Sequence, residues 1–379
     1  MCKVLYLFPG ANILRIAPSK NMFYHLSKVC NGTVIAPIYK KKESALIKKN
    51  NLGNFKHYII NSIKLPNLIR PLWEILNFCY RGLCLFYREK YDLIVTRGPW
   101  TTGFAGLLLK KITKTKLIIE LRGNPKKAFV LEQQKKTVRS VLKFKIAEWM
   151  MTFVLNGADH IKLLYWEQLK EYPQIKNNKR SVFHDFVPIN AIKPSIKSDK
   201  YILFMGGPWY LKGVDILIKA FKLISNNFPE YKLKIIGFCA DKGYFQKLAK
   251  DNSKIELGNP VPHNEAIKLL SRCTLFILPS RTEAMGRVLL EAMACKKPII
   301  ASNVDGIPTY IKHEFNGLLF ESENVKDLAQ KITIILSNPD YAKKLAENGY
   351  KYVHEHLSEE RYVECFKKMV EKVLKCPRK

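Results

Sequence analysis

Two carboxylates and one glycine lie close together in the second half of the chain. Glu283 stands three residues before Gly286, and Glu291 follows five residues after it. A glycine leaves room for an anion such as phosphate to approach the backbone, and carboxylates accept hydrogen bonds from sugar hydroxyl groups. The combination suggests a site for a nucleotide sugar. Taken singly, Glu283 could be a helix cap and Glu291 an ordinary solvated helix residue.

The surrounding stretch, residues 275–302, predicts the elements that would position these side chains. An apolar run closed by Pro279 and another opened by Pro298 flank the segment 286–295, whose apolar residues recur at helical spacing. A strand, a loop, a helix and a second strand make one βαβ unit, and such units bind ligands where the first strand ends and the helix begins. Free N–H groups and the helix dipole favour an anion there.

A similar stretch occurs upstream. An apolar run at 201–205 leads into a turn with Gly206, Gly207 and Lys212, and a helix is expected from Val214. The two glycines permit close backbone approach, and the lysine ammonium could meet a diphosphate at the helix start. The spacing fits neither a Walker loop nor the dinucleotide fingerprint.

The amino half offers candidates that follow expected strands. Arg97 and Arg122 each come directly after an apolar run, so both would emerge at carboxyl ends of a sheet. Each could equally pair with a loop carboxylate. Gly10 lies in the first turn, and His184 precedes Asp185 near the end of this half. A ligand role and a structural role are both open for these positions.

Short apolar runs alternate with helical stretches along the whole chain, which predicts α/β domains with doubly wound parallel sheets. A chain of 379 residues with 47% hydrophobic content suits two domains better than one. We expect a first domain at 1–195 and a second at 196–355. The last segment, 356–379, is expected to be a helix that could pack back on the first domain.

The positive charge is unevenly distributed. Of the net charge of +32, residues 1–200 carry 36 Lys and Arg against 12 Asp and Glu, and residues 201–379 carry 28 against 20. The amino half is therefore expected to face an anionic partner such as acidic lipid, a phosphorylated acceptor or nucleic acid. Basic clusters occur at Lys40–Lys42 and Lys110–Lys116. The apolar segment 68–87, with arginines among its residues, fits either buried core or membrane-surface docking.

No apolar run approaches the length of a bilayer span or of a signal-peptide core. The nine cysteines show no C-x-x-C spacing, which favours a reducing compartment. We expect a cytoplasmic protein, with peripheral contact at the inner face of the cell membrane as an option. Because no Asp-x-Asp pair and no ligand pattern among the histidines occur, no metal site is predicted.

Six sequence blocks in the carboxyl half occur together in one order. They are residues 206–221, 278–286, 290–295, 298–302, 306–308 and 316–319. Together these blocks resemble the carboxyl domain of family 4 retaining glycosyltransferases of the GT-B fold, over roughly residues 200–335. The resemblance implies an α/β architecture of two Rossmann-like domains whose parallel sheets face a central cleft. The amino half resembles the family only in plan.

The resemblance also implies roles for single residues. Glu283 would contact the transferred sugar and Glu291 the ribose hydroxyls, while Lys212 and the N–H groups around Gly286 and Arg287 hold the diphosphate. The family has an arginine where this chain has Gly207, and Arg287 or Arg281 could replace it. The family also has a histidine near the position of Arg122. The predicted catalytic residues are Glu283, Lys212 and Arg122. The predicted donor-binding residues are Gly206, Gly207, Lys212, Glu283, Ala284, Met285, Gly286, Arg287 and Glu291. The possible acceptor-side residues are Gly10, Arg97 and His184.

The implied reaction moves a hexosyl or related sugar from a nucleotide diphosphate sugar to an acceptor hydroxyl with retained configuration. The nucleotide sugar is a co-substrate, and no further cofactor is predicted. The expected acceptor is a glycan or a lipid-linked molecule in cell-surface polysaccharide or glycolipid synthesis. A sugar-nucleotide epimerase of the same architecture is one alternative. A basic nucleic-acid-binding protein is a weaker one, because no recognisable binding module is present, and no nucleic-acid partner is expected.

Overall fold

The computed structural model describes residues 1–10, 20–38, 52–61, 69–124, 126–127, 131, 138–195 and 197–375. The chain forms two compact units. The first comprises residues 1–123, 135–188 and 359–379, and the second comprises residues 124–134 and 189–358. Each unit is built on its own parallel sheet, so the predicted α/β class with two parallel sheets is confirmed.

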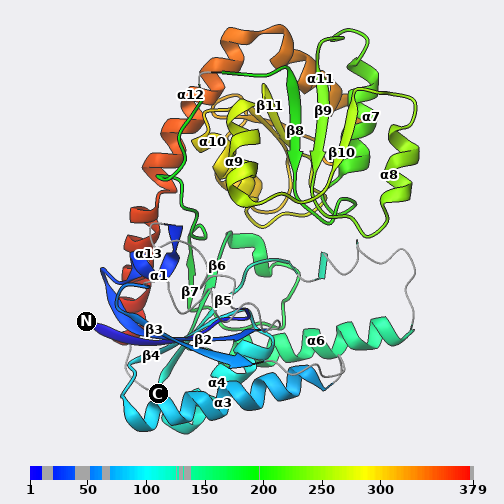
Figure 1. Ribbon diagram of the computed structural model, residues 1–379. Helices are drawn as coiled ribbons and strands as arrows, with labels where there is room; N and C mark the ends of the chain where they lie inside the picture. Colours follow the sequence, from blue (N-terminus) through cyan, green and yellow to red (C-terminus); the bar gives the residue numbers. More distant parts are fainter. Residues whose placement is uncertain are drawn as a thin grey trace. The chain divides into compact units, whose positions relative to one another are not determined.

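The first unit contains a seven-stranded parallel sheet in the order β3-β2-β1-β4-β5-β6-β7 (Figure 1). Its strands are β1 Cys2–Leu7, β2 Cys30–Ile38, β3 Phe55–Asn61, β4 Leu93–Arg97, β5 Lys116–Glu120, β6 His160–Leu163 and β7 Arg180–Val182. The central strands β1, β4 and β5 are mostly apolar because helices cover both faces of the sheet. In β1, Val4 and Tyr6 point into one core, and Leu5 and Leu7 point into the other.

Two helical layers fill those cores. Helices α3 Arg70–Arg88, α4 Thr101–Thr113 and α6 Val138–Gly157 cover one face of the sheet. Helices α1 Met22–Leu26 and α13 Glu359–Lys375 cover the other face (Figure 1). A short 3-10 helix, η4 Trp166–Leu169, follows β6.

Helix α3 is buried on one side only. Ile75, Phe78 and Leu85 pack inward, whereas Leu76 and Tyr80 are exposed. The core expectation for the apolar segment predicted at 68–87 therefore holds for one side of the helix, and the other side presents apolar residues to the surface. Residue 68, and the basic cluster Lys40–Lys42, lie outside the described residues.

The second unit contains a six-stranded parallel sheet in the order β10-β9-β8-β11-β12-β13. Its strands are β8 Tyr201–Met205, β9 Lys232–Ile236, β10 Ile255–Gly258, β11 Leu275–Leu278, β12 Ile299–Ser302 and β13 Leu318–Phe320. Its helices are α7 Val214–Ile224, α8 Lys242–Ala249, α9 His263–Arg272, α10 Arg287–Ala294, η5 Ile307–Thr309, α11 Val325–Ser337 and α12 Pro339–His356. Strands β8 and β11 are neighbours, with Ile202 opposite Leu275. The loops that follow them therefore emerge side by side.

The last helix, α13, belongs to the first unit although it follows the second unit in sequence. Tyr362, Phe366 and Val373 on this helix join the core that includes Phe23 of α1 and Val95 of β4. The first unit is thus completed by the carboxyl end of the chain.

We expect Phe366→Ala to lower the free energy of unfolding by about 3–5 kcal/mol, because it opens a cavity in that core. Leu374→Ala is the matched control on the same helix, since Leu374 is 40% exposed, and it should cost less than about 1 kcal/mol. Urea denaturation followed by circular dichroism measures both values. Equal losses in the two variants would contradict the placement of α13.

Candidate functional site

The loops after β8 and β11 are packed against each other in the second unit. The N–H of Arg281 donates a hydrogen bond to the carbonyl oxygen of Leu211 at 3.0 Å. Gly213, at a φ of 67°, lies so close to the other loop that a Cβ atom there would be 1.9 Å from the carbonyl oxygen of Pro279. Only glycine suits this position, because it has no Cβ and adopts positive φ without strain.

This packing brings Lys212 and Glu283 together. The ammonium Nζ lies 2.6 Å from Glu283 Oε2, and both side chains are mostly buried. A short charge-assisted contact in partly desolvated surroundings fixes both side chains. Two residues predicted to serve one donor site, one from each loop, thus lie in one place.

Asp305 fixes the loop that carries Glu283. Its Oδ2 accepts hydrogen bonds from the Thr282 hydroxyl at 2.5 Å and from the Glu283 N–H at 3.1 Å. The N–H of Gly306 donates to the Glu283 carbonyl at 3.1 Å. Lys127 Nζ, from the short segment 124–134 of this unit, contacts Asp305 Oδ1 at 2.5 Å. Sequence reasoning gave neither Asp305 nor Lys127 a role, although the motif at 306–308 directly follows the aspartate.

Helix α10 begins at the end of the same loop. Gly286 precedes it at a φ of 65°, Met285 is buried, and Arg287 is exposed in the first turn. Ala284 lies in the loop between Glu283 and Met285. The first N–H groups of a helix have no partner within it, so this end offers donors and a positive dipole to an anion.

A cavity of about 400 Å³ extends from the glycine turn to Glu291. Gly206, Gly207 and Glu291 line it together with apolar residues such as Ile236 and Val288. Glu291 is largely buried, and its Oε1 lies 3.1 Å from Nε2 of His263. Sequence reasoning found no role for His263, because the two side chains are distant in sequence. The cavity offers apolar walls and one carboxylate, a combination that suits a nucleoside.

The positions of three residues bear on the arginine that the resemblance expects at 207. A Cβ at Gly207 would lie 2.5 Å from the Phe238 carbonyl oxygen, so no side chain fits there without a shift of the backbone. Arg281 is engaged elsewhere, since its guanidinium makes two 2.8 Å hydrogen bonds to Asp215 and is 5% exposed. Of the two proposed substitutes, only Arg287 therefore presents an exposed guanidinium.

In the first unit, Asp185 forms ion pairs with both predicted arginines. Arg97 Nη2 lies 2.6 Å from Asp185 Oδ2, and Arg122 Nη2 lies 2.8 Å from the same oxygen. The Arg97 side chain is buried over the Phe8 ring, whereas the Arg122 side chain is 44% exposed. Both arginines thus have a loop carboxylate partner, and of the two Arg122 keeps more surface for a ligand.

Other titratable groups lie buried around this pair. Lys162 Nζ is 3.8 Å from Asp185 Oδ1, and burial lowers its pKa. The Nδ1–H of His184 donates to the Asp185 carbonyl at 2.9 Å, and its buried Nε2 has no hydrogen-bond partner among the described residues. Burial lowers the pKa of His184 to about 4. No atom of the described residues lies within 4 Å of the place where a Cβ at Gly10 would be, and residues 11–19 lie outside the described ranges.

Across the described ranges, no three His, Cys, Asp or Glu side chains are grouped so that they could hold a metal ion. In the same ranges no helix combines the length and the apolar content needed to cross a bilayer.

Comparisons with known proteins found relatives of this chain. Residues 188–352 match the family model described as glycosyl transferases group 1. An uncharacterized glycosyltransferase of Methanocaldococcus jannaschii is 30% identical over 309 residues, which are 79% of this chain and 81% of that protein.

Solved structures share the fold across nearly the whole chain. Sucrose-phosphate synthase from Thermosynechococcus elongatus superposes with a TM-score of 0.79 at 16% identity, covering 98% of this chain and 99% of that one. Anabaena HepE, solved in complex with UDP-glucose, gives 0.73 at 16% identity, with 98% and 99% covered. These likenesses confirm the predicted GT-B fold.

We expect substitutions of Arg281 and Arg287 to differ in their effect on the free energy of unfolding. Arg281→Gln leaves Asp215 buried without its cation and should lower the free energy of unfolding by about 3–5 kcal/mol. Arg287→Gln removes an exposed side chain and should change it by less than about 0.5 kcal/mol. Urea denaturation measures both. An Arg281→Gln variant as stable as the wild type would show that the contacts of Arg281 with Asp215 do not support the loop.

The buried histidine makes the first unit sensitive to acid. Because the pKa of His184 falls from its usual value of about 6.5 to about 4, the unfolded chain binds its proton more readily than the folded chain between these pH values. Stability should therefore fall as pH drops through this range, by up to about 3 kcal/mol from this group. His184→Gln should flatten the pH dependence, and His356→Gln, at an exposed position, should not. Parallel pH profiles for His184→Gln and the wild type would contradict the assignment.

Proposed function

The chain belongs to the glycosyl transferases group 1 family, and we propose that it transfers a sugar from a nucleotide diphosphate sugar to an acceptor hydroxyl with retention of configuration. The observation that carries this proposal is the contact between Lys212 and Glu283. It joins a cation and a hydroxyl acceptor from two neighbouring loops, beside a helix start and a nucleoside-sized cavity. The glycosyltransferase relatives favour neither an epimerase nor a nucleic-acid-binding protein.

The donor can be placed in this arrangement in one orientation. We place the nucleoside in the cavity that Gly206, Gly207 and Glu291 line, with Glu291 accepting from the ribose hydroxyls. The diphosphate then lies at the start of α10 near Arg287, and the sugar hydroxyls lie at Glu283. HepE binds UDP-glucose, which supports a nucleotide diphosphate sugar as the co-substrate, and we propose no further cofactor.

Stabilisation of the departing diphosphate is the main electrostatic task of such a transfer. The Lys212 ammonium lies 2.6 Å from the Glu283 carboxylate. We infer that the diphosphate takes over as the partner of Lys212, which frees the Glu283 carboxylate to accept hydrogen bonds from the sugar. Asp305 keeps the Glu283 backbone in place during this exchange, because its hydrogen bonds go to Thr282 and to the Glu283 N–H.

The acceptor side belongs to the first unit in this proposal. Arg122, anchored by Asp185 and 44% exposed, is the candidate cation for an anionic group of the substrates. We propose a glycan or lipid-linked acceptor in cell-surface polysaccharide or glycolipid synthesis, reached from the cytoplasmic side of the membrane. The excess of Lys and Arg in residues 1–200 supports an anionic surrounding of this kind.

The test begins with nucleotide diphosphates screened by thermal shift, followed by mass spectrometry of products from the corresponding sugar donors. We expect Lys212→Gln and Glu283→Gln each to lower transfer by about a hundredfold or more, because each removes charge that the transition state needs. Lys219→Gln, exposed on α7, is the matched control and should keep near-wild-type turnover.

Near-wild-type turnover in both site variants would remove the assignment. A donor sugar that changes configuration at a ring carbon when no acceptor is present would identify an epimerase instead.

A further inference from the structure

The outer surface of the α3–α4–α6 layer is unusually apolar. Large apolar side chains on these helices, and on the residue before α3, are exposed to solvent. They are Ile69, Leu72, Leu76, Tyr80 and Tyr87 at α3, Ile112 on α4, and Val138, Leu142, Ile146, Trp149 and Phe153 on α6. Exposed apolar residues scattered singly are ordinary on soluble proteins, but a continuous set along neighbouring helices marks an interaction surface.

Helix α6 shows the pattern most clearly. Val138, Leu142, Ile146, Trp149 and Phe153 recur at intervals of three or four residues, so they form one stripe along its whole length. Near its carboxyl end, the same helix supplies the core of the unit through Met151, Val154 and Leu155. A helix that is apolar on both sides needs a second apolar environment for its outer side.

Aromatic and basic side chains mix at one end of this stripe. The rings of Trp149 and Phe153 stack at 5.9 Å between centroids, and Lys111 Nζ lies 5.7 Å from the Phe153 ring centre. Trp and Tyr rings with lysine nearby are typical of the boundary between lipid headgroups and acyl chains.

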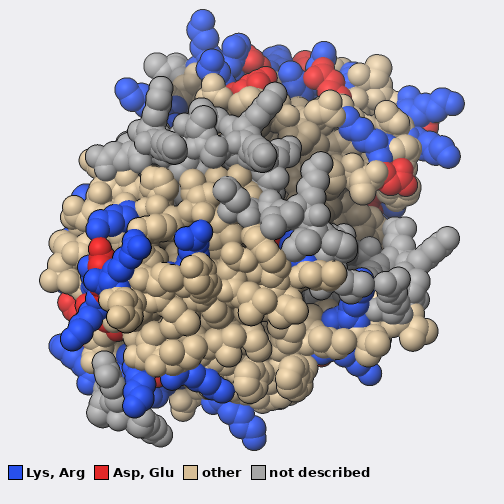
Figure 2. Space-filling model, turned by 60° about the horizontal axis from the view of Figure 1, so that its bottom comes forward, with Lys and Arg blue, Asp and Glu red and all other residues tan. Residues whose placement is uncertain are grey.

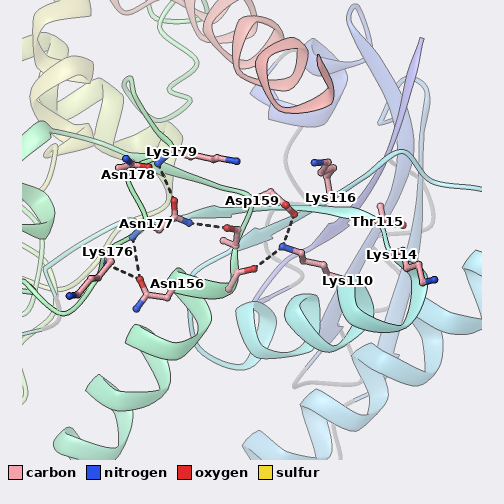
Figure 3. A pocket seen from close by; sticks show the side chains of 12 residues that line it. Lys110, Lys114, Thr115, Lys116, Asn156, Asp159, Lys176, Asn177, Asn178 and Lys179 are labelled. Carbon is pink, nitrogen blue, oxygen red and sulfur yellow. Dashed lines mark hydrogen bonds and ion pairs between the residues drawn. The ribbon is translucent and has the colours of Figure 1, made fainter. Parts of the chain in front are cut away.

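A basic pocket of about 850 Å³ adjoins this end of α6 (Figure 3). Five lysines and one aspartate line it, which leaves an excess of four positive charges. Lys110, Lys114 and Lys116 come from the end of α4 and the start of β5, and Lys176 and Lys179 come from the loop before β7. Asn156 and Gly157 line both this pocket and the neighbouring groove that contains Trp149 and Phe153.

Hydrogen bonds hold the walls of this pocket in place. Asn156 Oδ1 accepts from the N–H of Lys176 at 2.8 Å, and Asn177 Nδ2 donates to the Ala158 carbonyl at 2.9 Å. Lys110 is paired with Asp159, the one carboxylate among the described residues that line the pocket. The loop is therefore fixed to the carboxyl end of α6, and the remaining lysines line a preformed wall.

We propose that the outer face of α3, α4 and α6 docks on an anionic phospholipid bilayer. The apolar stripe and the Trp149–Phe153 pair enter the headgroup region, and the lysine pocket holds lipid phosphate groups. Figure 2, in which the bottom of Figure 1 with α3 is turned forward, shows a broad area where charged side chains are few and Lys and Arg lie mainly toward the border. Such a face matches a bilayer, whose apolar interior lies beneath an anionic surface.

Two features favour a bilayer over other partners. A duplex is held mainly by cations, whereas this face presents an apolar stripe beside the exposed Lys143 and Lys145, with the lysine pocket at one end. The stripe also follows a helix of 20 residues, about 30 Å long, which lies on the surface of its unit. The inference rests on the proposed function in one respect only: docking would bring this unit to a membrane-embedded acceptor.

The experiment measures co-sedimentation of the full chain with vesicles of phosphatidylcholine alone or mixed with phosphatidylglycerol. The wild type should bind the mixed vesicles and lose much of this binding in about 1 M NaCl, where the screening length is about 3 Å. The double variant Trp149→Ser, Phe153→Ser should bind about tenfold or more weakly, because the loss of apolar side chains lowers partitioning. Trp166→Ser is the matched control, since Trp166 and Trp149 are both 65% exposed and Trp166 lies off this face in η4.

The lysine pocket is tested separately. The triple variant Lys114→Gln, Lys176→Gln, Lys179→Gln should lose about tenfold or more in binding to the mixed vesicles and most of its salt dependence. A second triple variant, Lys343→Gln, Lys344→Gln, Lys351→Gln, removes the same charge from exposed positions on α12 and should bind like the wild type. Equal losses in both triple variants would show that only net charge matters and would overturn the pocket assignment.

Other occupants give distinct results. A concentration-dependent dimer that the Trp149→Ser, Phe153→Ser variant abolishes, with no vesicle binding, would make this face a self-association interface and overturn the proposal. Stabilisation by inorganic phosphate without vesicle binding would make the pocket a site for soluble anions and also overturn it. Donor turnover is measured in parallel without vesicles. Turnover without docking removes this inference alone, and docking without turnover removes the proposed reaction alone.

Discussion

The parallel pairing of β8 with β11 is the constraint on which the candidate site depends. It places two loops that are far apart in sequence at one edge of a sheet, and Gly213 then allows them to approach to backbone distance. A side chain at that position would separate the loops and, with them, Lys212 and Glu283. The site is thus set by the backbone first, and the charged pair occupies a place that the backbone has already made.

In both units, a carboxylate lies beside a cationic side chain. Lys212 and Glu283 are partly buried and neutralise each other, so their partial desolvation is offset without a ligand. In the first unit, Asp185 serves the buried Arg97 and the more exposed Arg122 at once. Each unit therefore holds a cation beside a carboxylate.

The sequence allowed the local elements to be predicted well. The stretch 275–302 contains its strand, loop, helix and strand in unbroken succession, and periodicity alone located them. Asp305, His263 and Lys127 were missed because their contacts join residues distant along the chain, and no spacing rule records such contacts. The choice between Arg281 and Arg287 likewise required the position of Asp215. Whether Arg97 pairs with a loop carboxylate required the position of Asp185. Helix α3 escaped a clear assignment because composition does not show which apolar side chains face outward.

The position of α13 has a consequence for how the protein is made. Tyr362 and Phe366 complete the core around Phe23, so the first unit waits for residues synthesised after the entire second unit. Removal of the residues after Ser358 would therefore open the core of the first unit while leaving every residue of the second unit in the chain.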